Sequence, residues 1–397
     1  MKKLLFGCII KMIISSRNTK LNTQEGRIMV IMNLKIDNFM LFRNFRMNMA
    51  YPKKIVDSSI EGEFLKEREN FRYKKINILM GANAVGKTSI GKMLMHIFNF
   101  IVQREREGVL DSVGDGKKEA TFSIDFVDSL YRLNRVDIKV VPEDEGSSKQ
   151  ILMVCARAVD IGKKDNYETC AKKLDQIPLQ LTSDVDAELD KTFPFGWMFC
   201  YSADSYNGTV RCEEYSNYPT ILDYTLRALD PSIEKVEKLN EVKDSYVIRM
   251  KQQDLIIQDG EVIRNNILSS GTKAGIDVAR MLSGICEGEY GFYYCDELFS
   301  YVHSDVEKAF LSVMINQLKH NQQLFFTTHN SDILDMQLPK HTFCFMKKYL
   351  SDETEPIKCV EASKYLKRNT DSLRNAVEND LFSTAPNLEL IYEIENI

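Results

Sequence analysis

The sequence predicts an α/β protein with a central, mostly parallel β-sheet, an antiparallel β-layer and a helical insertion. A glycine-rich loop lies between a short apolar run, 75–80, and a stretch with helical spacing, 87–103. Two later apolar runs are too short for helices and end in polar side chains, which is typical of buried parallel strands. Residues 120–126 and 135–141 alternate with period two, which predicts the antiparallel strands.

The composition excludes several classes of protein. Of 397 residues, 44% are hydrophobic and 27% charged, as in ordinary globular proteins. A net charge of -5 argues against a protein that coats nucleic acid by bulk charge, although a local basic groove stays open. The nine cysteines include no C-x-x-C pair, so we expect no zinc framework and reduced thiols in a cytoplasmic protein, mostly as small core residues.

The amino-terminal stretch needs a separate interpretation. Lys2-Lys3 and the apolar run after them resemble a signal peptide, but Lys11 interrupts the run and no cleavage site follows. We expect 1–31 to be a disordered extension, or a start assigned too early, with Met29 or Met32 as the first residue. Residues 32–397 would then form a single domain. Elsewhere no segment approaches the roughly 20 apolar residues that span a membrane, so no membrane association is expected.

The elements before the glycine-rich loop are a strand and a connection. Residues 33–39 alternate as a half-buried strand does. The residues that follow allow two interpretations: a hydrophobic strand with a solvated edge, or a position near the bound ligand for Arg43 or Asn38. Residues 52–75 are polar and predict a loop or hairpin.

The middle of the chain, 104–218, is expected to hold the antiparallel β-layer and a variable insertion lobe. Residues 104–118 predict an exposed connection. Within 151–218 we expect a strand at the start, a helix near 167–174 and a strand at 197–201. The sequence leaves open whether this segment is a lid, a partner surface or a helical lobe.

Helical spacing returns at 221–229. Asp230-Pro231 then resembles a cap and a first-turn proline, which predicts a second helix to about Val242. Strands are expected at 246–250 and 255–257, and Asp259-Gly260 predicts a hairpin turn after them.

The glycine-rich loop itself fits the phosphate-binding pattern G-x-x-x-x-G-K-[ST], the Walker A motif. It consists of Gly81, Ala82, Asn83, Ala84, Val85, Gly86, Lys87 and Thr88, with Ser89 next. Glycines permit the curl that aims backbone N–H groups at an anion, and the helix after it directs its positive end there. We expect Lys87 to bind phosphate and Thr88 to bind Mg²⁺. The alternative is a chance glycine-rich turn.

Three later motifs fit the same site. Ser269, Ser270 and Gly271 open a helix and form a candidate anion site, although such turns also cap helices commonly. The run 291–297 ends in Asp296 and Glu297, a candidate metal ligand and a candidate general base. The alternative there is a strand followed by an acidic helix cap.

The last motif follows the apolar run 324–328. His329 comes directly after it, at the ligand-binding edge of an open α/β sheet, and we expect it to sense the γ-phosphate. Before this run, Ser304 and Glu307 form a predicted capping box at the start of a helix.

In combination these motifs resemble ABC-type ATPase heads of the SMC/RecF kind, and most closely the stand-alone AAA-type proteins related to the OLD (overcoming lysogenisation defect) ATPases. The matching residues are Asn38-Phe39, GANAVGKTS at 81–89, LDPSIEKVE at 229–237, LSSGTKAG at 268–275, FYYCDE at 292–297, His303, FFTTHNSDILD at 325–335, and the tail from 373–375 to 385–387. Such proteins occur in bacterial anti-phage and abortive-infection systems.

The resemblance implies an ATP- and Mg²⁺-dependent ATPase. Lys87 and Thr88 would bind phosphate and metal, Asp296 would hold the metal, Glu297 would activate water and His329 would contact the γ-phosphate. Ser269 and Gly271 would complete the site of a second subunit, so a homodimer or higher homo-oligomer is expected. No glutamine-loop residue is identifiable, and no Toprim nuclease domain is indicated, so a nuclease or toxin effector would be a separate protein.

Two rival functions stay open. One is a RecF-type DNA repair or recombination ATPase, which would bind nucleic acid. The other is a scaffold that binds nucleotide without hydrolysing it.

Overall fold

The structure is a computed structural model that describes residues 28–52, 58–144, 149–202, 215–239, 241–242, 245–251, 253–258, 261–263, 268–349, 354–368, 371–382 and 389–396. The strands are β1 Val30–Asp37, β2 Phe45–Asn48, β3 Phe64–Leu65, β4 Arg68–Arg72, β5 Ile76–Met80, β6 Ala120–Val127, β7 Arg132–Pro142, β8 Gln150–Asp160, β9 Trp197–Tyr201, β10 Ile233–Lys238, β11 Ser245–Met250, β12 Asp254–Gln258, β13 Glu261–Ile263, β14 Phe292–Asp296, β15 Gln323–Thr327, β16 Phe343–Lys348 and β17 Ile357–Glu361. The helices are α2 Lys87–Gln103, α3 Glu107–Asp111, α4 Tyr167–Asp175, α5 Val185–Leu189, α6 Tyr218–Leu229, α7 Ser270–Glu287, α8 Ser304–Gln317, η1 Ser331–Asp335, η2 Lys340–Thr342, α9 Ala362–Tyr365, α10 Leu373–Glu378, α11 Glu389–Glu393 and η3 Ile394–Asn396.

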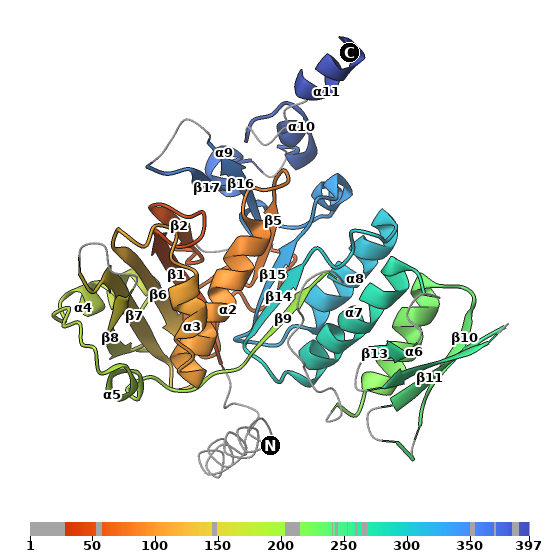
Figure 1. Ribbon diagram of the computed structural model, residues 1–397, viewed down its shortest axis with the longest axis horizontal. Coiled ribbons are helices and arrows are strands. Elements are labelled where there is room, and N and C mark those ends of the chain that lie inside the picture. The colour runs from red at the N-terminus through yellow and green to blue at the C-terminus, as the bar shows by residue number, and fades with distance from the viewer. Residues whose placement is uncertain are drawn as a thin grey trace.

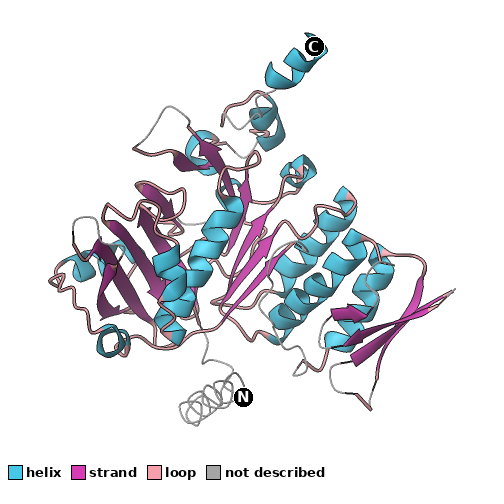
Figure 2. Ribbon diagram, in the orientation of Figure 1, coloured by secondary structure: helices cyan, strands magenta, loops and turns pink. Residues whose placement is uncertain are grey.

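The centre of the molecule is a six-stranded sheet in the order β17-β16-β5-β15-β14-β9 (Figure 1). Its strands pair in parallel except for the antiparallel edge strand β17. α2 lies on one side together with the five-stranded sheet, and α7 and α8 lie on the other (Figure 2). The predicted α/β fold with a mostly parallel central sheet is confirmed.

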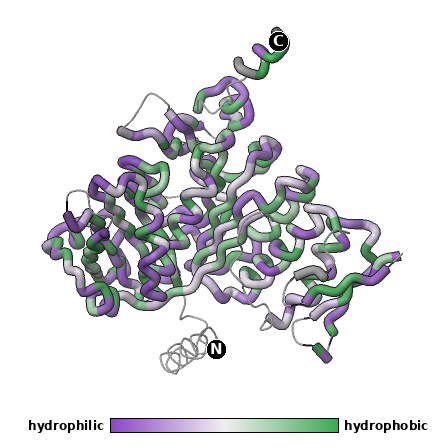
Figure 3. Tube along the Cα trace, in the orientation of Figure 1, coloured by the Kyte–Doolittle hydropathy of each residue, from purple (hydrophilic) through white to green (hydrophobic). Residues whose placement is uncertain are grey.

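Side chains of the central strands point alternately to two buried faces of the sheet, which explains why most of them are apolar. In β14, Phe292 and Tyr294 belong to the core cluster that contains α2, whereas Tyr293 and Cys295 belong to the cluster that contains α7 and α8. A strand covered on both faces is therefore apolar at most of its positions. Hydrophobic segments accordingly gather along this sheet and α2 (Figure 3).

The antiparallel β-layer is the five-stranded sheet in the order β2-β1-β6-β7-β8. The predicted strands at 120–126 and 135–141 are β6 and β7, which pair antiparallel. One face is apolar, because Leu34, Ile124 and Val136 lie opposite one another and enter the core beside α2. The predicted helix near 167–174 is α4, which packs on this layer as part of a smaller cluster.

Residues 233–238 correct the predicted second helix. They form β10, which pairs antiparallel with β11 at the edge of a separate four-stranded sheet, β10-β11-β12-β13. Asp230 does not begin a second helix: it is the C-cap residue of α6, and its Oδ1 accepts from the backbone N–H and the hydroxyl of Ser232 in a turn. Ile233 and Val236 are buried in the adjoining core. Burial of these residues, and not local helix propensity, decides the conformation of the segment.

The extension predicted over 1–31 and the hairpin turn predicted at 259–260 lie partly or wholly outside the described residues. β1 begins at Val30, and Met29, Val30 and Ile31 are fully buried, so the extension predicted over 1–31 does not reach residue 31. Residues 1–27 lie outside the described part of the chain. The turn Asp259-Gly260 is also outside it, but β12 and β13 on either side pair antiparallel, as a hairpin requires.

The cysteines also differ in part from the expectation. Cys344 on β16 and Cys359 on β17 form a disulfide, since the two neighbouring strands bring their Cα atoms to 6.0 Å. The prediction of reduced thiols is wrong for this pair. Cys155, Cys170 and Cys295 are free and buried, as expected for small core residues.

Among the described residues, no helix combines the length and the apolar character needed to cross a membrane.

Candidate functional site

The glycine-rich loop connects β5 to α2 at the carboxyl edge of the central sheet, in the predicted strand–loop–helix context. Gly81, Ala84 and Gly86 have φ values of 149°, 61° and 99°, so the loop curls through the left-handed region three times. A Cβ at position 81 would lie 2.4 Å from the carbonyl oxygen of Met346, which excludes any side chain there. Such a curled backbone at the start of a 17-residue helix suits an anionic phosphate.

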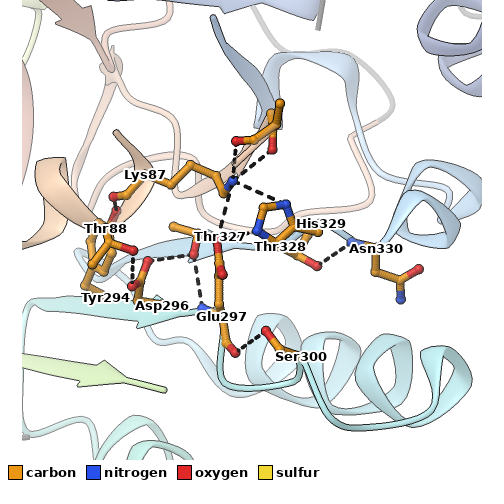
Figure 4. Close-up of polar contacts among 12 residues, drawn as sticks. Lys87, Thr88, Tyr294, Asp296, Glu297, Ser300, Thr327, Thr328, His329 and Asn330 are labelled. Carbon is orange, nitrogen blue, oxygen red and sulfur yellow. Dashed lines mark hydrogen bonds and ion pairs between the residues drawn. The ribbon is translucent and has the colours of Figure 1, made fainter. Parts of the chain in front are cut away.

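Lys87 is the buried cation of the site. Its Nζ donates to the carbonyls of Gly81 at 2.8 Å and Ala82 at 3.1 Å, and it lies 3.4 Å from Glu297 Oε1. Nδ1 of His329 is also 3.4 Å away (Figure 4). Burial lowers the pKa of Lys87, and the charge of Glu297 partly offsets that effect.

Thr88 and Asp296 come from different elements and meet at the sheet edge. The Thr88 hydroxyl donates to Asp296 Oδ2 at 2.7 Å, and Thr327 donates to the other oxygen at 2.8 Å. Asp296 is 2% exposed, and burial raises its pKa although both hydroxyls act against that rise. A hydroxyl and a carboxylate at hydrogen-bond distance can bind one Mg²⁺, which keeps water and phosphate oxygens as its remaining ligands. The donor set therefore fits Mg²⁺ bound with a nucleotide.

Glu297 follows the end of β14 in a left-handed conformation with φ of 52°, uncommon for a residue with a Cβ. Its backbone N–H donates to Thr327 Oγ1 at 3.1 Å, while its carboxylate lies 2.8 Å from Nε2 of His329. Burial raises the pKa of Glu297, but the neighbouring His329 and Lys87 lower it more, so that the pKa lies below its ordinary value. The carboxylate is thus held in its basic form beside the loop.

The serine–glycine turn lies elsewhere. Ser269 caps α7 by accepting from the Thr272 backbone N–H at 3.1 Å, and a Cβ at Gly271 would meet the Tyr301 carbonyl at 2.9 Å. Within the described residues, no hydrogen bond or ion pair joins 269–271 to 81–89. The fold of one chain therefore brings the phosphate loop, Asp296, Glu297 and His329 together, and leaves the turn apart.

The contacts of Asn38 bear on the two interpretations left open for it, and those of Glu307 correct its predicted role. Asn38 is 3% exposed, and its amide donates to the carbonyls of Asp115, Lys118 and Glu119, so it fastens a loop and does not face a ligand. The helix α8 is capped by His303, whose Nδ1 accepts from the Asp305 backbone N–H at 3.2 Å. The predicted capping box is wrong, because the Glu307 side chain points to residues beside His329.

Sequence reasoning missed two side chains that shape the site. Thr327 orients Asp296, and the register that places these two residues opposite each other on β15 and β14 could have indicated it. The Tyr294 hydroxyl donates to the Lys87 carbonyl at 2.7 Å and fixes the start of α2. Nothing in the spacing of the sequence signals that contact.

Comparison with known proteins gives no family model that matches and no match among curated proteins. Similar solved structures include SMC head domains and RecF. One is an SmcHead bound to the C-winged helix domain of ScpA, with 13% identity, a TM-score of 0.49, and 85% of this chain and 99% of that chain covered. The SMC head domain from Thermotoga maritima has 14% identity, a TM-score of 0.41 and coverage of 83% and 99%. The recombination mediator protein RecF-ATPrS has 12% identity, a TM-score of 0.42 and coverage of 85% and 100%.

Proposed function

We propose that the chain is an ATPase that binds ATP with Mg²⁺ on the loop 81–89. The observation that carries this is the 2.7 Å contact between Thr88 and Asp296, which joins the phosphate loop to the acidic strand end. A glycine-rich loop alone is a weak signal, but a buried carboxylate aimed at its threonine is the arrangement that nucleotide-bound Mg²⁺ needs. Lys87, 4% exposed, supplies the positive charge for phosphate.

The hydrolytic roles follow from the geometry around Glu297. Its lowered pKa keeps the carboxylate ionised, and an ionised carboxylate at this place can accept a proton from water. His329 contacts Glu297 with one ring nitrogen and approaches Lys87 with the other, so it can respond to a γ-phosphate between them. Bound Mg²⁺ would supply neutralisation of phosphate charge.

We further propose that the site is completed by a second copy of the chain. Ser269, Ser270 and Gly271 would close the phosphate loop of the partner, so that ATP favours the dimer and hydrolysis releases it. The separation of this turn from the loop within one chain supports the proposal, since the exposed Ser269 and Ser270 are then available to another copy.

The partner and the pathway rest on the resemblance of the motifs. We propose that pairing gates a separate effector, a nuclease or toxin, in anti-phage defence in the cytoplasm. A RecF-type repair ATPase predicts ATP-dependent binding of DNA ends or gaps that weakens with salt. A scaffold that does not hydrolyse ATP predicts binding without repeated phosphate release.

The test is multiple-turnover phosphate release from MgATP by the purified chain, with light scattering in parallel. Lys87→Ala should abolish nucleotide binding. Glu297→Gln should retain binding, lower kcat by about 10²- to 10⁴-fold as for loss of a general base, and accumulate an ATP-bound dimer. A Glu297→Gln protein that turns over ATP normally, or stays monomeric in ATP, would contradict the proposal.

A further inference from the structure

The segment that carries His329 is attached to α8 through one buried carboxylate. Glu307 is 3% exposed and lies in the first turns of this helix. Its Oε1 accepts from the Thr328 hydroxyl at 2.6 Å, and its Oε2 accepts from the Asn330 amide at 2.7 Å. The residues immediately before and after His329 therefore both donate hydrogen bonds to the Glu307 side chain.

The segment is also ordered within itself, so the two contacts cannot shift independently. The Thr328 hydroxyl accepts from the Asn330 backbone N–H at 2.9 Å, and Asn330 Oδ1 accepts from the Asp332 backbone N–H at 2.9 Å. Ser304, at the start of α8, donates to the Asp332 carboxylate at 2.5 Å. A turn fixed at both ends leaves the backbone of His329 little freedom.

We infer that Glu307 is a positioning residue that sets the place of His329 against Glu297 and Lys87. The inference rests on the proposed ATPase activity and deepens it. Glu307 touches neither the loop 81–89 nor Glu297 in the contacts described, so its effect passes through Thr328 and Asn330. It also makes the position of His329 depend on α8, whose capping residue His303 is 76% exposed in its side chain.

A purely structural role is the competing explanation, and a swap of the hydrogen-bond partners separates the two. Glu307→Gln keeps the volume and can still accept from Thr328. With that bond kept, its new NH₂ group would face the NH₂ of Asn330, which cannot turn over without losing its bond from Asp332. The opposite orientation of the amide at 307 would accept from Asn330 but leave the Thr328 hydroxyl without its acceptor, so one contact is lost either way. Adding Asn330→Asp restores the contact with the roles exchanged, because the amide at 307 donates to the carboxylate at 330. The second oxygen at 330 still accepts from Asp332.

The experiment measures kcat and KM for MgATP, with the melting temperature, for the unchanged full chain and for the variants. A displacement near 1 Å can cost about 100-fold in rate. We expect Glu307→Gln to lower kcat by roughly 10- to 100-fold with KM little changed, and the double variant to recover most of kcat. The matched control is Glu188→Gln, a buried carboxylate that accepts from Ala156 N–H at 2.9 Å and from Lys191 at 2.6 Å in the β-layer. It should leave kcat unchanged.

The outcomes are distinguishable. The inference is overturned if Glu307→Gln keeps full kcat, or if the double variant does not recover the lost kcat. In either case, phosphate release by the unchanged chain would still support the proposed ATPase activity. An equal loss of kcat in Glu188→Gln overturns it as well, because the effect would then be general destabilisation. No phosphate release by the unchanged chain would refute the proposed function, and the inference with it.

Discussion

The substitution Gly91→Ala tests how closely α2 packs against Tyr294 of β14. Gly91 lies one turn into α2, and a Cβ there would sit 2.5 Å, 2.8 Å and 3.0 Å from Cε1, Cζ and Cδ1 of Tyr294. That ring is fully buried, and its hydroxyl holds the Lys87 carbonyl, so it cannot swing away. Overpacking of this kind costs about 1–3 kcal/mol. Replacing a helix-interior glycine by alanine returns about 1 kcal/mol. Gly91→Ala should therefore reduce the free energy of unfolding by about 1 kcal/mol.

The matched control for this variant is Gly284→Ala in the interior of α7. The new Cβ would lie 2.9 Å from Cε of Met198, the far end of a flexible side chain, so the same helix-propensity gain meets little resistance. Urea unfolding at constant m compares the two. Because a shift of α2 also moves Thr88 from Asp296, KM for MgATP should rise about fivefold in Gly91→Ala, which corresponds to about 1 kcal/mol. A Gly91→Ala protein as stable as Gly284→Ala would refute the packing described.

Three further predictions concern residues away from the reacting groups. Burial lowers the pKa of Lys75 from 10.5 to about 8 in the folded chain. Between these pH values the unfolded chain binds one more proton than the folded chain, so the free energy of unfolding should rise with pH from about 8 to 10.5. Lys75→Met should remove this rise of roughly 3 kcal/mol, as measured by urea unfolding at several pH values. Asn38→Asp would place a carboxylate oxygen against the carbonyls of the 115–119 loop. The free energy of unfolding should fall by at least about 2 kcal/mol in urea unfolding. An unchanged urea midpoint would contradict the hydrogen bonds assigned to Asn38. Arg374→Ala removes the bonds from α10 to Asp335 in η1. Because this pair is exposed to solvent, the melting temperature should fall only slightly in thermal unfolding, and Arg374→Lys should recover part of the fall.

The central sheet and most of the candidate site could be predicted because their signals are local. The loop 81–89 has its glycines and lysine at fixed spacing, and α2 begins and ends where the helical spacing does. Apolar runs that end in Asp296 or His329 predicted buried parallel strands, and parallel strands bring their carboxyl ends to one edge. The meeting of the loop 81–89, Asp296 and His329 could therefore be predicted without knowledge of side-chain packing.

What could not be predicted depends on contacts between distant segments. Residues 233–238 have a helix-like start, yet pairing with β11 makes them a strand. Glu307 fits a capping box by spacing, but its buried carboxylate accepts from Thr328 and Asn330 on the segment after β15. Asn38 likewise serves a loop 77 residues away. In each case the tertiary partner, which the local sequence does not contain, decides the role.

The same contacts link the turn 269–271 to His329 within one chain. A Cβ at Gly271 would meet the Tyr301 carbonyl at 2.9 Å, so the turn packs closely against the residues just before α8. α8 in turn reaches the segment around His329 through Glu307. If a second copy binds the turn, as we propose, it would contact the start of a series of packed groups that ends at His329. Contact alone does not establish coupling. The Glu307→Gln and Asn330→Asp pair tests one link of this series, from α8 to the segment of His329, where hydrogen bonds can be exchanged with little change in volume.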